Sequence, residues 1–222
     1  MALEPRGWRG RRRVTHTALA LCVLLTVSGC AGSGYTYVAE DELGVYFRVP
    51  ERFTVFDAEE VLPTVAGDVP QETAAQLQAQ QWIVSFDSGD DPRVDAFLGQ
   101  AEKPTDALAG FARVRVLQEQ ERLGYSLNSL RNEVVPAEQL QQTGGRLRVF
   151  GTEEVSQEGG QGLHMTFALE LADGTLVIDQ TALVDPATRR VYLLALGCSS
   201  RCFEASRDEI AAITESWTIE ER

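Results

Sequence analysis

The amino-acid sequence predicts an α+β fold, an α/β/α sandwich in which an antiparallel sheet lies between helices on both faces. Three observations lead to this prediction. Residues 146–184 alternate apolar and polar side chains and contain strong turn signals, as hairpins of an antiparallel sheet do. Residues 191–196 are apolar on both faces, so this strand needs cover on both sides. Apolar stripes at helical spacing, within 105–123 and after Ser206, supply candidate covering helices.

Residues 1–29 have the composition of a signal peptide. Five arginines precede an apolar stretch of 11 residues, Thr17 to Val27, which is too short to span a membrane. The end of the stretch, Val27-Ser28-Gly29-Cys30, resembles the lipobox of bacterial lipoproteins: an aliphatic residue, two small residues and a cysteine. That resemblance implies cleavage before Cys30 and a diacylglyceryl group on its thiol. An ordinary signal peptide with a chance cysteine is the alternative, and both Sec and twin-arginine export stay open.

The charge of the remaining chain limits its partners. The whole sequence has 20 basic and 33 acidic residues, and residues 1–29 account for five arginines and Glu4. The other 15 basic and 32 acidic residues give residues 30–222 a net charge of −17, which repels nucleic acid and anionic lipid headgroups. Attachment to a membrane therefore depends on acyl chains at Cys30. We expect a lipid-anchored protein on the extracytoplasmic face of the cell membrane, with no nucleic-acid partner.

The domain organisation follows from composition. After the signal peptide, residues 30–42 are mostly small or polar, and we expect the lipidated cysteine and a flexible tether there. Residues 43–222 have the length of one ordinary globular domain, and the 44% apolar content of the chain is enough for a hydrophobic core.

The first part of the domain is predicted to mix strands with one polar helix. Residues 44–56 indicate two strands joined by a turn, because aromatic and β-branched side chains alternate with polar ones. A polar helix is predicted from Pro70 to Gln81. Short strands follow at 82–86 and 94–99.

A stronger helix is predicted from Thr105 to Leu123, with Thr105 as its cap and Gly124 after its end. Four apolar residues fall on one stripe of this helix: Leu108, Phe111, Val114 and Leu117. Residues 125–146 are ambiguous. We expect a short helix after Pro136 and a break at Gly144-Gly145.

The C-terminal half gives the clearest strands. Residues 146–155 form one, and in the next, 163–171, apolar side chains share one face while polar ones, including His164, share the other. Asp173-Gly174 is a hairpin signal before the returning strand 175–184.

The last predicted element is a helix that starts near Ser206. Ser206 and Glu209 have the spacing of a capping box. Ile210, Ile213 and Trp217 share one stripe, which we expect to pack on the sheet.

Two cysteines of the domain, Cys198 and Cys202, are expected to form a disulfide, because the chain is directed to an oxidising compartment. They are four residues apart and can approach only if the backbone turns. The alternative is a metal-binding pair, but further ligands are not close in the sequence.

The sequence offers little for catalysis. His164 is the only histidine after residue 29, and no serine or cysteine near it has nucleophile-elbow spacing. A triad could still assemble around it in space. Three adjacent acid pairs, Glu59-Glu60, Asp90-Asp91 and Glu153-Glu154, favour solvated surface over paired acid–base groups, because neighbours on a strand point apart. We expect a protein that is not an enzyme and has no catalytic residues.

Cofactor and metal sites are also not expected. The acidic stretch "DSGDDPRVD" (87–95) could surround calcium, but its glycine departs from the EF-hand position and a plain acidic turn is the favoured reading. The sequence contains no phosphate-binding glycine loop and no dinucleotide fingerprint.

The order of elements resembles the PsbP-like superfamily, an α/β/α sandwich around an antiparallel sheet. The shared features are an early aromatic hairpin, "VYFRVPERFTVF", a long middle helix, the run of hairpin strands and a final "IAAITESWTI". The likeness covers residues 43–219, fits 125–146 poorly, and extends to lipoproteins of the LpqN type from GC-rich bacteria. It carries no catalytic motif, and it implies a binding or assembly role rather than an enzymatic one.

Three functions are compatible with these observations. The first is a lipid-anchored envelope lipoprotein whose domain binds a partner protein of the envelope or assists assembly. The second is a lipoprotein that binds a small ligand or a lipid, which requires an apolar pocket. The third is an envelope hydrolase that uses His164 or a carboxylate pair. The oligomeric state stays open.

Overall fold

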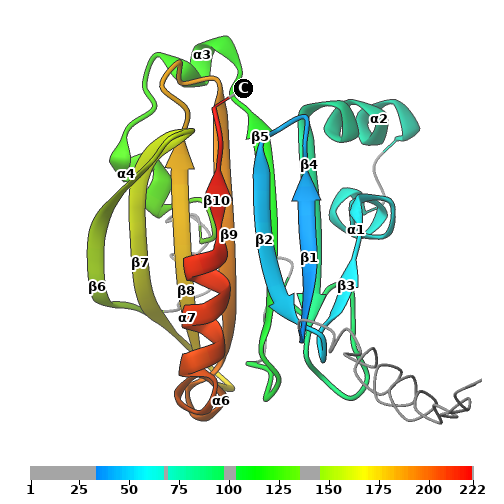
Figure 1. Ribbon diagram of the computed structural model, residues 1–222, viewed down its shortest axis with the longest axis vertical. Coiled ribbons are helices and arrows are strands. Elements are labelled where there is room, and N and C mark those ends of the chain that lie inside the picture. Colours follow the sequence, from blue (N-terminus) through cyan, green and yellow to red (C-terminus); the bar gives the residue numbers. More distant parts are fainter. Residues whose placement is uncertain (1–33, 68–69, 98–103, 136–145, 222) are drawn as a thin grey trace, which may run out of the picture. The chain divides into compact units, whose positions relative to one another are not determined.

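The larger of two antiparallel sheets organises the structure, a computed structural model that describes residues 34–67, 70–97, 104–135 and 146–221. The chain divides into Met1–Gly34 and Tyr35–Arg222, and the second unit holds every element described below. The seven strands of the larger sheet follow the spatial order β3-β4-β5-β9-β8-β7-β6 (Figure 1). In chain order these strands are β3 (Thr54–Phe56), β4 (Gln81–Asp87), β5 (Ala109–Val116), β6 (Arg146–Gln157), β7 (Gly160–Leu171), β8 (Gly174–Val184) and β9 (Arg190–Ser199).

A smaller sheet joins the two ends of this unit. It consists of β1 (Tyr35–Glu40), β2 (Val45–Pro50) and β10 (Thr218–Ile219), in the order β1-β2-β10. Residues 35–40, which we expected in the tether, therefore pair with β2. The predicted hairpin over 44–56 does not form, because β2 belongs to the small sheet whereas β3 pairs with β4.

The helices are short. They are α1 (Ala58–Ala66), α2 (Gln71–Gln80), α3 (Glu119–Arg122), α4 (Leu127–Arg131), α6 (Ser200–Ala205) and α7 (Arg207–Ser216). Helix α2 and strand β4 confirm the polar helix and the strand predicted at 70–81 and 82–86.

Strand β9 is buried on both faces, as its sequence predicts. On one face, Tyr192, Leu194 and Leu196 pack in a cluster with Phe47 of β2 and with Trp217 after α7. The small sheet and α7 cover this face, and α7 crosses it in front of β8 (Figure 1). The sequence predicts helices on this face but does not predict the small sheet that packs there.

The opposite side chains of β9 form a second cluster. Val191, Leu193 and Ala195 pack there with Val61 of α1 and Leu130 of α4. Helices therefore contribute to the cover of both faces of the sheet, which confirms the predicted fold class.

The helix predicted from Thr105 to Leu123 is wrong, because residues 109–116 form strand β5 between β4 and β9. Phe111 and Val114 look like one helical stripe in the sequence, but they lie in opposite core clusters of the sheet. Gly110 is the residue of this segment that indicates a strand. A Cβ there would lie 2.5 Å from the backbone oxygen of Ala195, so two strands approach closely at this position. The long middle helix implied by the family resemblance is likewise not found among the described residues.

Other predictions in the first half are partly corrected. Residues 94–97 form turns rather than the start of a strand over 94–99, and Phe97 is buried in the second cluster. Helix α1 was missed, although Asp57 and Glu60 form a capping box at its start. The helix expected after Pro136 and the break at 144–145 lie outside the described residues.

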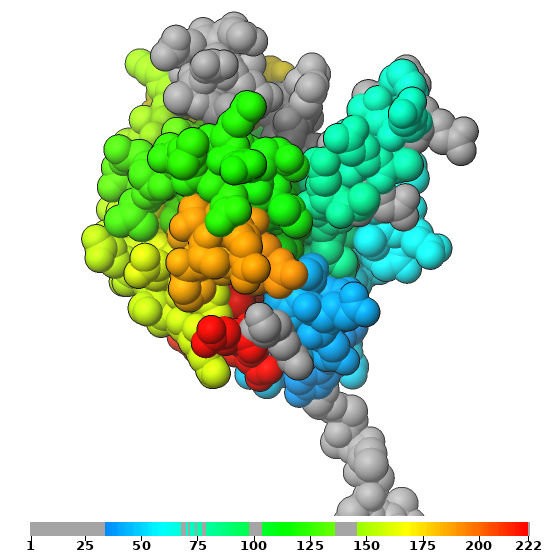
Figure 2. Space-filling model, turned by 90° about the horizontal axis from the view of Figure 1, so that it is seen from above, coloured from blue at the N-terminus to red at the C-terminus, as the bar shows by residue number. Residues whose placement is uncertain are grey.

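Glu133 fastens the segment after β5 to the sheet. Its carboxylate accepts hydrogen bonds from Arg113 and Arg115 of β5, both at 2.8 Å, and from the Tyr125 hydroxyl at 2.5 Å. Burial alone would raise the pKa of Glu133, but these hydrogen bonds, led by that of Arg115, lower it below its ordinary value. This segment also lies against the turn between β8 and β9, seen as green against orange in Figure 2, where Arg122 donates to two backbone oxygens of the turn.

The last helix confirms the predicted start near Ser206 but not the predicted capping box. The Ser206 side chain makes no cap hydrogen bond. Glu209 instead forms an ion pair with Arg52, which lies in the turn between β2 and β3. Ile210 and Ile213 are buried against the sheet, as predicted.

Cys198 and Cys202 lie at the junction of β9 and α6. Their sulfur atoms are 2.07 Å apart and their Cα atoms 5.8 Å apart, as in a disulfide bond. The turn from strand to helix brings the two residues together across four positions of sequence.

We expect replacement of both cysteines by alanine to lower the free energy of unfolding by about 2 kcal/mol, because the cross-link limits the unfolded chain over a short loop. Urea unfolding followed by tryptophan fluorescence measures the change. The unreplaced protein in the presence of a reductant is the matched control and should lose a similar amount. An unchanged midpoint in reductant would contradict the bond.

Candidate binding groove

The two polar features that the sequence singles out, the stretch 87–95 and His164, each line a cavity. The first cavity, of about 760 Å³, lies between the loop after β4, residues 105–108 and the helices α6 and α7. The second, of about 870 Å³, lies between α6–α7 and strands β6, β7 and β8. Which of them is free to bind a ligand depends on what their polar groups already contact.

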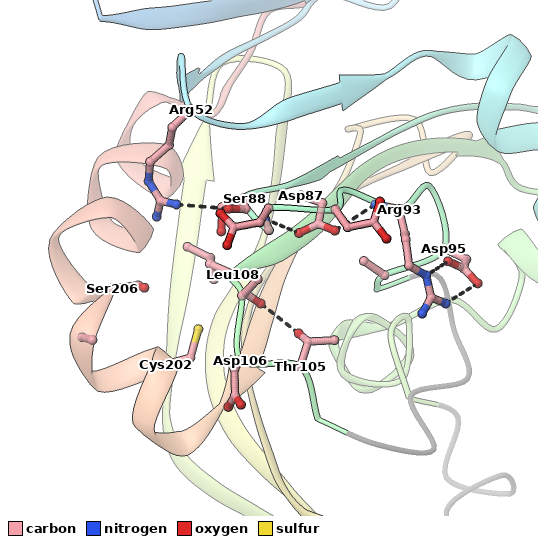
Figure 3. A pocket seen from close by; sticks show the side chains of 16 residues that line it. Arg52, Asp87, Ser88, Arg93, Asp95, Thr105, Asp106, Leu108, Cys202 and Ser206 are labelled. Atoms are coloured by element: carbon pink, nitrogen blue, oxygen red, sulfur yellow. Dashed lines mark hydrogen bonds and ion pairs between the residues drawn. The ribbon is translucent and has the colours of Figure 1, made fainter.

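The carboxylates of the first cavity hold its own loop in place. Asp87 is buried and accepts hydrogen bonds from the backbone N–H groups of Gly89 at 2.9 Å and Arg93 at 3.0 Å. Arg93 also pairs with Asp95 at 2.8 Å and lowers the pKa of that carboxyl. Figure 3 shows Asp87 and Ser88 between Arg52 on one side and the Arg93–Asp95 pair on the other.

The calcium alternative for 87–95 therefore finds no support in the part of the chain that is described. No group of three or more histidine, cysteine or acidic side chains is placed there to hold a metal ion. Asp90 and Asp91 are exposed, in keeping with the acidic turn that the sequence favours.

The second cavity is an open groove, which we call the β6 groove. Residues of strands β6, β7 and β8 form its floor, and residues of α6 and α7 form its wall. Figure 1 shows how these strands and helices are arranged. Most of its β6 and helix residues are exposed to solvent. Its lining includes Arg148, Phe150, Glu153, His164, Asp179 and Ala211.

His164 lies on the floor of the β6 groove and is held from two sides. Its Nε2 lies 2.8 Å from a carboxylate oxygen of Asp179 on β8, and its Nδ1 lies 2.9 Å from Glu153 on β6. Asp179 also accepts hydrogen bonds from the hydroxyls of Thr166 and Thr214, both at 3.1 Å. The cluster thus connects β6, β7, β8 and α7 across the groove.

This arrangement makes His164 a cation at neutral pH. The hydrogen bond to Asp179, against the opposing effect of burial, raises the pKa of His164 from 6.5 to about 9. A protonated imidazole cannot act as a general base, and both of its nitrogens already face carboxylates. The described geometry therefore argues against a triad built on His164, and it uses Glu153 as a partner of His164 rather than as half of an acid pair.

A β-bulge in β6 directs an aromatic ring into the groove. The pairing of β6 with β7 shifts between Val149 and Gly151, so Phe150 has no partner in the register. Half of the Phe150 surface is exposed. The Arg148 guanidinium carbon lies 4.6 Å from the centre of its ring. Arginine and aromatic side chains in such positions are typical of protein-binding surfaces.

The sequence places His164 on a polar face but does not predict its partners. Asp179 is the residue that could have indicated them, because it lies within the apolar strand "LVIDQTALV". A carboxylate that is buried in such a strand requires hydrogen-bond partners. Phe150 could not be found, since simple alternation along β6 gives no sign of the bulge. Of the predicted site residues, Cys202 lines the first cavity, Cys198 is buried, and Cys30 lies outside the described residues.

Comparison with known proteins supports the fold. Neither a family model nor a curated protein matches the sequence. The structure is similar to the solution structure of cyanobacterial PsbP, CyanoP, from Synechocystis sp. PCC 6803, at 10% identity and a TM-score of 0.50, over 88% of this chain and 99% of that one. The chain has a PsbP-like fold.

Two further likenesses are weaker. One is to LpqN, involved in cell envelope biogenesis of Mycobacterium tuberculosis, at 11% identity and a TM-score of 0.45, covering 84% of this chain and 90% of that chain. The other is to the Ran-binding protein Mog1p of Saccharomyces cerevisiae, at 9% identity and a TM-score of 0.46, covering 84% of this chain and 96% of that chain.

None of the described helices has both the length and the apolar character that a membrane-spanning helix needs.

The raised pKa of His164 predicts how stability depends on pH. The contribution of its ion pair is fully present below pH 6.5, the unfolded pKa, and is lost as pH rises through about 9. We expect His164→Gln to be less stable than the unchanged protein by about 1–3 kcal/mol at pH 6 and to approach it above pH 9.5. Urea unfolding of both proteins between pH 6 and 10 measures the difference. A difference independent of pH would contradict the charged state of His164.

Proposed function

We propose that this chain is a lipid-anchored lipoprotein of the bacterial cell envelope and that its PsbP-like domain is a non-enzymatic module that binds a partner protein in the β6 groove. The observation that carries the binding role is the composition of the groove. It presents an exposed Phe150–Arg148 pair above a floor whose only histidine is held as a cation by two carboxylates.

The location rests on the first 30 residues of the sequence. The arginine-rich start, the apolar stretch of 11 residues and the sequence Val27-Ser28-Gly29-Cys30 together favour export and lipidation. Two acyl chains would give stable attachment, each buried methylene contributing about 0.8 kcal/mol. The net charge of −17 on residues 30–222 leaves those acyl chains as the source of membrane affinity.

A protein partner fits the groove better than an acyl chain does. Its volume is large enough for a small ligand. However, charged side chains from the floor and the wall, Glu153, Glu204, Arg207 and Glu215, line it beside its apolar groups. Burying these charges against a hydrocarbon chain would be unfavourable. Across a protein–protein interface they can remain at a solvated rim around the aromatic residue.

Lipidation is expected at Cys30 alone. Mass spectrometry of the protein purified from bacterial cells that process it should find Cys30 as the first residue, with its thiol carrying a diacylglyceryl group. Cys30→Ser should leave the chain unlipidated and free of the membrane fraction. A protein that begins at Met1, or an unmodified Cys30 thiol, would remove the proposed location.

The groove is expected to contact the partner directly. A photo-crosslinking residue at Glu215, which is exposed on the groove wall, should join the lipidated protein to a partner in intact cells. Ala211→Trp fills the groove from α7 and should reduce this crosslink about tenfold, a loss of about 1.4 kcal/mol in affinity. Ala187→Trp, an equal change in the exposed turn between β8 and β9, should leave the crosslink unchanged. Equal yields from both variants would remove the groove as the binding site.

A further inference from the structure

Strand β6 forms one edge of the larger sheet and is its most exposed strand. It pairs with β7, and no other described strand lies beside it. Its first nine residues are all exposed, including Leu147, Val149 and Phe150, which retain 41–50% of their surface. Soluble proteins usually protect a long edge strand with prolines, charged side chains, β-bulges or a covering element, because its backbone can pair with another strand. Strand β6 contains no proline and no lysine, and its protection consists of its arginines, its glutamates and its bulge. An identical strand can accommodate these features.

The charges of β6 are arranged so that the strand complements itself. Basic residues, Arg146 and Arg148, occupy its first half, and acidic residues, Glu153 and Glu154, occupy its second half. When a strand pairs antiparallel with an identical strand, the first half of one lies opposite the second half of the other. The pairing can then place Arg148 opposite Glu153 of the second copy, which stabilises it. Arg146 pairs with Glu170 of its own chain, and Glu153 also contacts His164.

The bulge selects one register for such a pairing. A two-fold axis between Phe150 and Gly151 places Arg148 opposite Glu153 of the second copy and Phe150 opposite its Gly151. All four of these residues line the β6 groove, so each pair lies on the same face of the sheet, as directly opposed residues must. Because the axis passes through the bulge, the bulge of one strand lies opposite the bulge of the other. Directly opposed residues therefore share a face of the sheet on both sides of the axis.

Gly151 has room for the ring that this register brings to it. A Cβ built on Gly151 meets no atom within 4 Å, so the space above this residue is open. An aromatic side chain opposite a glycine fills such a gap in antiparallel sheets. The two exposed Phe150 rings would each cover a Gly151.

From these observations we infer that β6 pairs antiparallel with β6 of a second copy of this chain, joining two seven-stranded sheets into one through a two-fold axis between Phe150 and Gly151. The contact is isologous and closes on itself, so it makes a dimer rather than a filament. It uses the free backbone edge of β6 and shares Arg148 and Phe150 with the groove of the proposed function. The two proposals are told apart by their crosslinks, because Glu215 on the groove wall reports the partner, whereas Val149 and Thr152 on the other face of β6 report the dimer.

The dimer should be weak. The interface is one strand wide, and the net charge of −17 on each copy opposes association at long range. Two symmetric Arg148–Glu153 pairs add only a modest contribution. The reversal of one charge places like charges opposite each other twice, and we expect it to weaken association about tenfold.

Oxidative crosslinking tests the register in the full chain. Val149 lies opposite Thr152 of the second copy in this register, whereas two Val149 residues lie about 10 Å apart along the strands. Cells that co-express differently tagged Val149→Cys and Thr152→Cys chains should give a disulfide-linked heterodimer after oxidation. Cells that express either variant alone should give little. Equal crosslinking by one variant alone, or none by the mixture, would overturn the inference.

Charge exchange in the same cells separates specific pairing from chance collision. Arg148→Glu or Glu153→Arg, introduced into both tagged chains, should each reduce the crosslink about tenfold, and the double exchange should restore it. Arg201→Glu, the same charge change on the exposed start of α6, should have no effect. Thermal unfolding of each variant checks that the domain remains folded. A double exchange that leaves the folded protein uncrosslinked would also overturn the inference.

Discussion

The burial of β9 on both faces is the constraint on which the rest of the fold depends. Residues 191–198 of this central strand are all buried. A strand of this kind is stable only when apolar layers cover both faces of its sheet. The small sheet and α7 provide one layer, and α1, α4 and the loop that carries Phe97 provide the other. The ends of the unit contribute β1, β2 and β10 to the first layer, so it is completed only when residues far apart in sequence meet.

The candidate site arises where this cover ends. Helix α7 crosses β8, where Thr214 donates to Asp179, and does not cover β6 (Figure 1). The polar face of β6 and β7 is therefore left as the floor of a groove. Asp179 lies beneath α7 with only 8% of its side chain exposed. A carboxylate that is buried in this way needs several hydrogen-bond donors. His164, Thr166 and Thr214 supply them. The same cluster that satisfies a buried acid therefore fixes the shape of the groove and makes its histidine unsuitable as a base.

The sequence predicted those parts of the fold in which one signal dominates. The hairpin strands β7 and β8 alternate clearly and have a strong turn at Asp173-Gly174, and the face assignment of His164 is correct. Strand β5 was mistaken for a helix because burial on both faces removes alternation, and Phe111 and Val114 then have the spacing of a helical stripe. The Phe150 bulge and the pairing of Glu209 with Arg52 depend on contacts between distant segments, which local patterns do not encode.

The β1–β2 hairpin determines how the domain responds to a pulling force. Its open end lies at Tyr35, opposite Pro50, and its turn joins Glu40 to Val45. Tension that enters through the chain before Tyr35 meets the strand bonds one pair after another, as in unzipping, rather than all together. Strand β1 has no fully buried residue, so its detachment exposes little of the core. Six residues released in this way would add about 20 Å of extended chain while the larger sheet stayed intact.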